Sequence, residues 1–127
     1  MVSVLAVVVD CVDARMQAAW WAQLLDYRLS ERNPGEFEVS DARRSGTPLY
    51  FMNVPESKSA KNRLHIDVTT DGPLEDEIVK MTGMGAVLVE MRQDPSSFDH
   101  PDTWAVMRDP EGNEFCVLNA ESVTGLT

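Results

Sequence analysis

The fold of this chain is decided by two stretches of the same plan, LAVVVD at residues 5–10 and LHIDVT at residues 64–69. Each is a strand-like run that leads through an aspartate into a helix-like run, at residues 15–25 in the first half and 74–81 in the second. Further short strand-like segments follow in both halves. This internal repeat predicts two small modules, each with one strand, one helix and more strands, that bury each other's sheets.

Composition restricts the class of protein and its partners. The 127 residues are enough for one domain with a sizeable core, and 43% hydrophobic residues is typical of a globular protein. Asp and Glu number 21 against 11 for Lys and Arg, so the formal net charge is -10. Such a surface repels nucleic acid and anionic lipid, and we expect neither as a partner. The apolar residues 2–9 are too short for a membrane span and lack the flanks of a signal peptide, so we expect a cytoplasmic protein.

Strand and turn signals continue within each half. The valine-rich residues 3–10 predict a strand that is covered on both faces. Residues 36–40 alternate weakly between polar and apolar, which is typical of an edge strand or a half-exposed strand. In the second half, residues 104–108 and 114–118 predict a hairpin around DPEGN at residues 109–113. Proline suits the first central position of that turn, and glycine supplies a positive φ.

A polar segment divides the chain. Residues 55–62 contain a proline, two lysines and two serines, and they predict a linker. The chain is therefore expected to be a single domain of residues 1–127, with a first module at 1–54 and a second module at 63–127. Its two cysteines are too few for a disulfide framework, so both are expected to be free thiols.

Three motifs resemble a known family. NRLHIDV at residues 62–68 and DPEGNEFCV at residues 109–117 are similar to the glyoxalase-like branch of the vicinal oxygen chelate superfamily. This superfamily also contains glyoxalase I, extradiol dioxygenases and bleomycin-binding resistance proteins. The pair Trp20-Trp21, followed by LLD, matches the first helix of the family. The resemblance covers essentially the whole chain and implies an α+β fold, in which two βαβββ modules form curved mixed sheets around a central cleft, and a homodimer.

The resemblance also implies where a metal would bind. In metal-dependent members, the first and last strands of each module supply the ligands, and these positions correspond to Ala6, Met52, His65 and Cys116. Alanine offers no donor, a thioether suits copper(I) better than magnesium, iron or zinc, and one imidazole with one thiol does not complete a site. Glu114 is a candidate substitute carboxylate, since it shares the face of Cys116. We predict no metal, no cofactor and no catalytic residue.

Side-chain alternation predicts which residues line the cleft. Counting by twos from His65 places Asp67 on the cleft face and the apolar residues between them on the helix side. His65 and Asp67 have an equally plain structural interpretation, as residues that hold the sheet together. Trp104 is expected to stack on a planar ligand or to pack in the core, and Cys116 with His65 as its base is a hypothetical nucleophile. The predicted ligand-binding residues are His65, Asp67, Trp104, Cys116, Tyr50, Met52, Glu114 and Asp10.

Two functions from different classes follow, and the sequence leaves open whether the chain is an enzyme. In the first, a metal-free cleft binds a small organic molecule, as drug-sequestering relatives do. The acidic balance favours a cationic or amphipathic ligand, with Asp10, Asp67 and Glu114 as counter-charges. In the second, the chain is a lyase, isomerase or dioxygenase that uses a divalent metal through His65 and an atypical ligand set. A dimeric accessory domain without chemistry of its own is a third interpretation.

Overall fold

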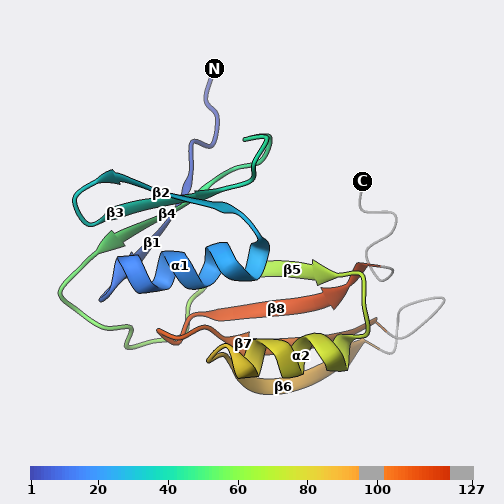
Figure 1. The fold of residues 1–127 in the computed structure, drawn as a ribbon. Coiled ribbons are helices and arrows are strands. Elements are labelled where there is room, and N and C mark those ends of the chain that lie inside the picture. The colour runs from blue at the N-terminus through green and yellow to red at the C-terminus, as the bar shows by residue number, and fades with distance from the viewer. Residues whose placement is uncertain (95–101, 121–127) are drawn as a thin grey trace. The chain divides into compact units, whose positions relative to one another are not determined.

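Each half of the chain folds into one strand, one helix and three further strands (Figure 1). The computed structural model describes residues 1–94 and 102–120. The first half contains β1 (Val7–Cys11), α1 (Ala14–Leu25), β2 (Arg28–Asn33), β3 (Glu36–Ser40) and β4 (Leu49–Asn53). The second half contains β5 (Ile66–Thr70), α2 (Leu74–Gly83), β6 (Val87–Asp94), β7 (Asp102–Arg108) and β8 (Glu114–Asn119). This order confirms the predicted α+β class and the two βαβββ modules.

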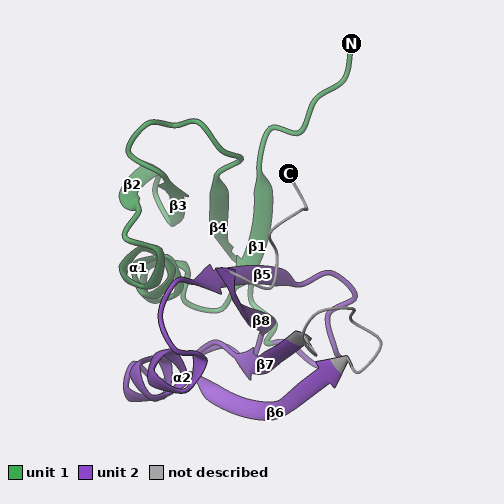
Figure 2. Ribbon diagram, turned by 90° about the vertical axis from the view of Figure 1, so that its right-hand side faces the viewer, with its two compact units in different colours: residues 1–57 green, residues 58–127 purple. Residues whose placement is uncertain are grey.

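The two halves are separate compact units, residues 1–57 and residues 58–127 (Figure 2). Each unit has one four-stranded mixed sheet, in the order β1-β4-β3-β2 in the first and β5-β8-β7-β6 in the second. In both sheets the first and last strands of the unit pair in parallel, and the other neighbours are antiparallel. Neither helix in the described ranges has the length and apolar character needed to cross a membrane.

In the first unit, α1 packs mainly on β3 and β4. Asp13 caps the helix, as its sequence position suggests, by accepting a hydrogen bond of 3.1 Å from the backbone N–H of Met16. Beneath the helix, the Arg15 guanidinium lies 4.9 Å from the ring centre of Phe37. The strand residues on this side are almost fully buried: Phe37, Val39, Leu49 and Phe51. Residues of the opposite parity lie on the side of the sheet away from its own helix, which we call the helix-free face.

In the second unit, α2 packs on β6, β7 and β8. Its core consists of Leu74, Met81, Ala105, Met107, Phe115 and Val117, all of them buried. The register Asp67↔Cys116↔Val106 runs across β5, β8 and β7, and these three residues have the parity of the helix-free face. The predicted hairpin is confirmed, with Gly112 at φ 89° in its turn.

Two expectations about individual strands were wrong, and one strand was not anticipated. β1 begins at Val7 rather than at residue 3, and Val7 and Val8 are 43% and 53% exposed. The reason is that β1 is an edge strand, which has a neighbour on one side only. β3 was expected to be an edge strand or a half-exposed strand, but it lies between β4 and β2, and four of its five residues are buried. β2 was not anticipated, since its six residues are all exposed and carry no apolar pattern.

Candidate functional site

Three side chains from neighbouring strands converge on the helix-free face of the second sheet. His65 immediately precedes β5, Asp67 lies within β5, and Cys116 is the register partner of Asp67 in β8. His65 Nε2 lies 3.2 Å from Asp67 Oδ1, and one donor atom from each of the three residues lies within 4.8 Å of the others. The side chains of His65 and Asp67 are 45% and 56% exposed, whereas Cys116 is buried. The thiol therefore lies beneath an exposed imidazole and carboxylate.

The electrostatics of this cluster keep the thiol protonated. Burial, followed by the negative charge of Asp67, raises the pKa of Cys116, and the positive charges of Arg92 and Lys61 oppose this only in part. The thiol also hydrogen-bonds to Asp67, which favours the protonated form further. In an activated cysteine, the thiol proton passes to an imidazole. Here a carboxylate contacts both the thiol and the imidazole, so the geometry argues against the nucleophile hypothesis for Cys116.

The same cluster fits a divalent metal better than the sequence suggested. Sequence reasoning counted His65 and Cys116 as donors and did not count Asp67, although the alternation had placed it on the same face. Imidazole nitrogen, carboxylate oxygen and thiolate sulfur are all ligands of Zn²⁺, and three protein ligands with an open position are typical of catalytic zinc sites. In the first unit, the corresponding positions hold Ala6, which offers no ligand atom, and Met52.

Aromatic and charged side chains continue the helix-free face beyond this cluster. Trp104 is half-buried, and it lies between Leu118 of β8 and Arg92 of β6 in the sheet register. The Arg92 guanidinium pairs with Glu90 at 2.7 Å on its own strand. Trp104 therefore lies on the same face of the sheet as Cys116, and its ring offers an aromatic surface beside the cluster.

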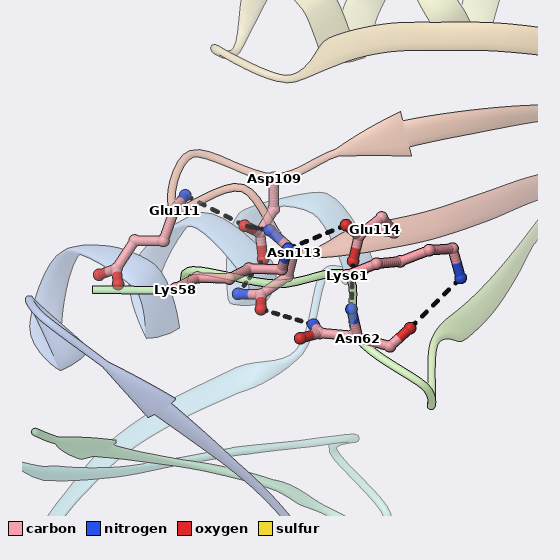
Figure 3. Close-up of polar contacts among 7 residues, drawn as sticks. All are labelled: Lys58, Lys61, Asn62, Asp109, Glu111, Asn113 and Glu114. Carbon is pink, nitrogen blue, oxygen red and sulfur yellow. Dashed lines mark hydrogen bonds and ion pairs between the residues drawn. The ribbon is translucent and has the colours of Figure 1, made fainter. Parts of the chain in front are cut away.

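Glu114, another predicted ligand-binding residue, is fully engaged within the second unit (Figure 3). Its Oε1 pairs with Lys58 Nζ at 2.9 Å, and its Oε2 accepts a hydrogen bond of 3.1 Å from the backbone N–H of Asn62. Its side chain is only 11% exposed. Burial alone would raise the pKa of Glu114, but the bonds from Lys58, its own backbone and Asn62 together lower it. Its contact with a ligand remains a prediction.

The remaining predicted residues lie on the helix-free face of the first sheet. Asp10 and Met52 are register partners, and the Tyr50 hydroxyl donates a hydrogen bond of 2.8 Å to Glu36. That bond, followed by burial and the charge of Glu36, raises the pKa of Tyr50. Glu36 and the buried Glu38 were missed by sequence reasoning, although their alternation with apolar neighbours in β3 gives them the same parity. A role for Asp10, Tyr50 and Met52 in ligand binding stays a prediction.

Comparison with known proteins identifies the family. A family model described as a glyoxalase-like domain matches residues 6–118. The chain belongs to the glyoxalase-like domain family. The match includes both strands that carry the His65–Asp67–Cys116 cluster, and it agrees with the resemblance seen in the sequence motifs. A search of curated proteins found no match to this glyoxalase-like domain.

Solved structures share the fold at low sequence identity. A glyoxalase/bleomycin resistance protein/dioxygenase family enzyme from Burkholderia phytofirmans PsJN is 17% identical, with a TM-score of 0.73 over 93% of this chain and 98% of that chain. Lactoylglutathione lyase from Agrobacterium tumefaciens is 13% identical, with a TM-score of 0.66 over 96% of each chain. A mutant of the fosfomycin resistance protein FosX from Listeria monocytogenes, complexed with Mn(II) and 1S,2S-dihydroxypropylphosphonic acid, is 11% identical, with a TM-score of 0.73 over 99% of this chain and 98% of that chain. At these identities the likeness establishes the fold of the glyoxalase-like domain and not its reaction.

Proposed function

We propose that this glyoxalase-like domain binds a small organic molecule on the helix-free face of its second sheet, without requiring a metal. The observation that carries the proposal is the convergence of an imidazole, a carboxylate and a thiol within 4.8 Å of one another. Small-molecule sites combine a few polar groups with aromatic and aliphatic surface. Trp104, Val106 and Leu118 supply such surface, since each is half-buried and shares the parity of Cys116.

The charges on this face indicate which part of a ligand would bind to the cluster. Glu114 is neutralised by Lys58, and Glu90 by Arg92. Asp67 is more exposed than either, and the side chains that contact it are the His65 imidazole and the neutral Cys116 thiol. A cationic or amphipathic ligand would therefore place its positive group beside Asp67 and its planar part against Trp104.

The test is a thermal-shift screen of cationic, neutral and anionic aromatic compounds in metal-free buffer, followed by fluorescence titration of the compounds that stabilise the protein. We expect saturable binding that weakens at least about tenfold in Asp67→Ala, because hydrogen bonds to charged groups contribute about 1.5–3 kcal/mol. Trp104→Ala should weaken binding by removing the stacking surface. Asp71→Ala, an exposed carboxylate just after β5, is the matched control and should bind as the parent does. Unchanged affinity in both site variants would remove the proposal.

A second candidate function is favoured by the same cluster. His65, Asp67 and Cys116 would hold a thiophilic divalent ion, and the ion would supply a Lewis acid for a lyase, isomerase or dioxygenase reaction. Because a metal-bound thiol loses its proton, binding should release protons and produce a thiolate-to-metal absorption band with Co²⁺. Loss of that band in both His65→Ala and Cys116→Ser would favour the metal-dependent function. Protein that shows no such band with excess Co²⁺ would leave the metal-free binder as the better account.

We further propose a cytoplasmic homodimer. Cys11 and Cys116 are both buried thiols, which suits a reducing compartment. Edge strand β6 presents Val87, Leu88, Val89 and Met91 at 39–55% exposure, and an exposed apolar edge is suited to pairing with a second copy. Light scattering coupled to size exclusion should give twice the mass of the 14.2 kDa chain, and Val89→Lys should shift the protein towards monomer. A monomeric parent protein would contradict the dimer without affecting the ligand site.

A further inference from the structure

We propose that Glu114 is a positioning residue that holds His65 in place beside Asp67 and Cys116. His65 lies just outside the regular ladder, since the first registered pair between β5 and β8 is Ile66↔Phe115. The position of the imidazole therefore depends on what holds the chain before His65. That segment, residues 58–62, is held by Glu114, which is the residue immediately before Phe115.

The Glu114 carboxylate continues the pairing of β5 and β8 beyond the end of the ladder. Its Oε2 accepts the backbone N–H of Asn62, as a strand carbonyl would do for a neighbouring strand. Its Oε1 pairs with Lys58, so two points of the segment are attached to one side chain. The chain from Asn62 to Ile66 is thus fixed at both ends, with His65 between them. Arg63 and Leu64 in the same stretch are exposed.

The turn between β7 and β8 supports this attachment (Figure 3). The Asn62 side chain donates a hydrogen bond of 2.8 Å to Asn113 Oδ1. Asn113 is in turn held by Asp109, which accepts its backbone N–H at 2.9 Å and its side-chain N–H at 3.2 Å. Asp109 is 3% exposed and also accepts the backbone N–H of Glu111. The anchor for residues 58–62 is therefore a turn whose hydrogen bonds converge on the buried Asp109.

Burial makes the carboxylate of Glu114 effective in this role. The side chains of Glu114 and Lys58 are 11% and 20% exposed, so water competes less for their contact than at an open surface. By comparison, Glu90 and its partner Arg92 are 46% and 57% exposed, and both lie on β6. The Glu90–Arg92 pair does not involve residues 58–62, which makes Glu90→Gln a matched control for the His65 contacts of the Glu114 variants.

The experiment uses ligand-free protein and two readouts of the cluster. One is the set of nuclear Overhauser contacts from the His65 ring to Asp67 and Cys116; the chain has two histidines, so His100→Gln assigns the signals. The other is the rate at which Cys116 reacts with a thiol reagent in a Cys11→Ala background. In Glu114→Ala, the contacts should disappear and the rate should rise about tenfold, since losing bonds to a charged group shifts local opening by about that factor.

The conservative variant separates positioning from general stability. Glu114→Gln keeps an oxygen acceptor for the Asn62 N–H but loses the charge that pairs with Lys58, so it should retain most of the His65 contacts and resemble Lys58→Met. Glu90→Gln should keep the parent's His65 contacts. The thiol rate is not compared for this control, because the substitution frees Arg92, whose positive charge acts on the Cys116 thiol. A Glu114→Ala protein that melts at lower temperature but keeps the parent's His65 contacts and thiol rate would overturn the inference. If Glu114→Ala does not fold, equal loss of contacts in Glu90→Gln and Glu114→Gln would overturn it as well.

The inference rests on the proposed function only in treating His65 as part of a ligand site. Both readouts are taken without ligand, so the two ideas can fail separately. Loss of the His65 contacts in Glu114→Ala, together with a compound screen that finds no binder, would leave the positioning role standing and the binding function without support. Saturable binding that is equal in the parent and in Glu114→Ala would sustain the function and contradict the positioning role.

Discussion

The helix-free faces of the two sheets share one topology and differ in chemistry. On the first sheet, the positions that correspond to His65 and Cys116 hold Ala6 and Met52, and the carboxylates nearby are already engaged: Glu36 by Tyr50 and Asn33, and Glu38 by Arg44. On the second sheet, an imidazole, a carboxylate and a thiol lie together, with two of them exposed. One copy of the duplicated scaffold thus brings three potential ligand-binding groups together, while Glu36 and Glu38 of the other copy are hydrogen-bonded to neighbouring side chains.

The largest effect should come from the cores, where the two units are alike. Phe51 and Phe115 are each at most 1% exposed on the helix side of their sheets. Replacing either with alanine leaves a cavity and should lower the free energy of unfolding by about 3–5 kcal/mol. Urea denaturation followed by tryptophan fluorescence measures this loss. If the loss in free energy of unfolding were several times smaller in one variant than in the other, the two cores would not be energetically equivalent.

The second largest effect should be on ligand affinity, which should differ between variants of the two helix-free faces. Asp67→Ala should weaken binding by about tenfold or more, because a carboxylate that bonds a charged or polar group contributes about 1.5–3 kcal/mol. Asp10→Ala, the exposed aspartate on the first sheet beside Met52, should change affinity much less. Titration calorimetry with the best compound from the screen compares the two variants directly. A larger loss in Asp10→Ala would transfer the site to the first unit.

The acid side of the stability curve should depend on Glu114. Its pKa is lowered in the folded protein, so the stability that it contributes is present above the ordinary glutamate value of 4.5 and is lost as the pH falls below it. Glu114→Gln should abolish this part of the acid dependence and lower the neutral-pH stability by about 1 kcal/mol. Denaturation midpoints across the acid range measure the effect. Glu56→Gln, in an exposed part of the chain, should keep the parent's profile.

The smallest effect concerns the first face. The Tyr50 pKa is raised, chiefly by the hydrogen bond that its hydroxyl donates to Glu36. Glu36→Gln removes the negative charge, so the Tyr50 pKa should fall back towards 10.0. Ultraviolet absorbance of tyrosinate follows this titration in a Tyr27→Phe background, where Tyr50 is the remaining tyrosine of the chain. An unchanged Tyr50 titration in Glu36→Gln would show that the polar groups of this face are less coupled than the structure indicates.

Much of the fold was predictable because its signals are local. The hairpin around residues 109–113 follows from one proline and one glycine at fixed turn positions, and the helix start at Ala14 follows from Asp13. The strands were harder. β2 has no apolar pattern, and whether β1 or β3 lies at an edge depends on partners far along the chain. A strand's own residues do not encode which strand will lie beside it.

The site shows the same division. Alternation correctly put Asp67 and Cys116 on one face, since successive side chains of a strand point to opposite sides. The alternation pattern did not show that Asp67 contacts both His65 and the thiol. The metal ligands predicted from the sequence therefore included His65 and Cys116 but not Asp67. Nor did the alternation pattern show that Glu114 was already engaged by Lys58, which is 56 residues away in sequence.

The sequence by itself determined the repeat, the turn and the face that each strand residue occupies, because backbone geometry within a few residues dictates these features. The tertiary structure alone decided which side chains meet: the imidazole, carboxylate and thiol on the second sheet, and the glutamate that fixes the segment before His65. Such contacts come from the pairing of strands that are distant in sequence. Their energies depend on burial and on neighbouring charges, which exist only once the sheet has formed.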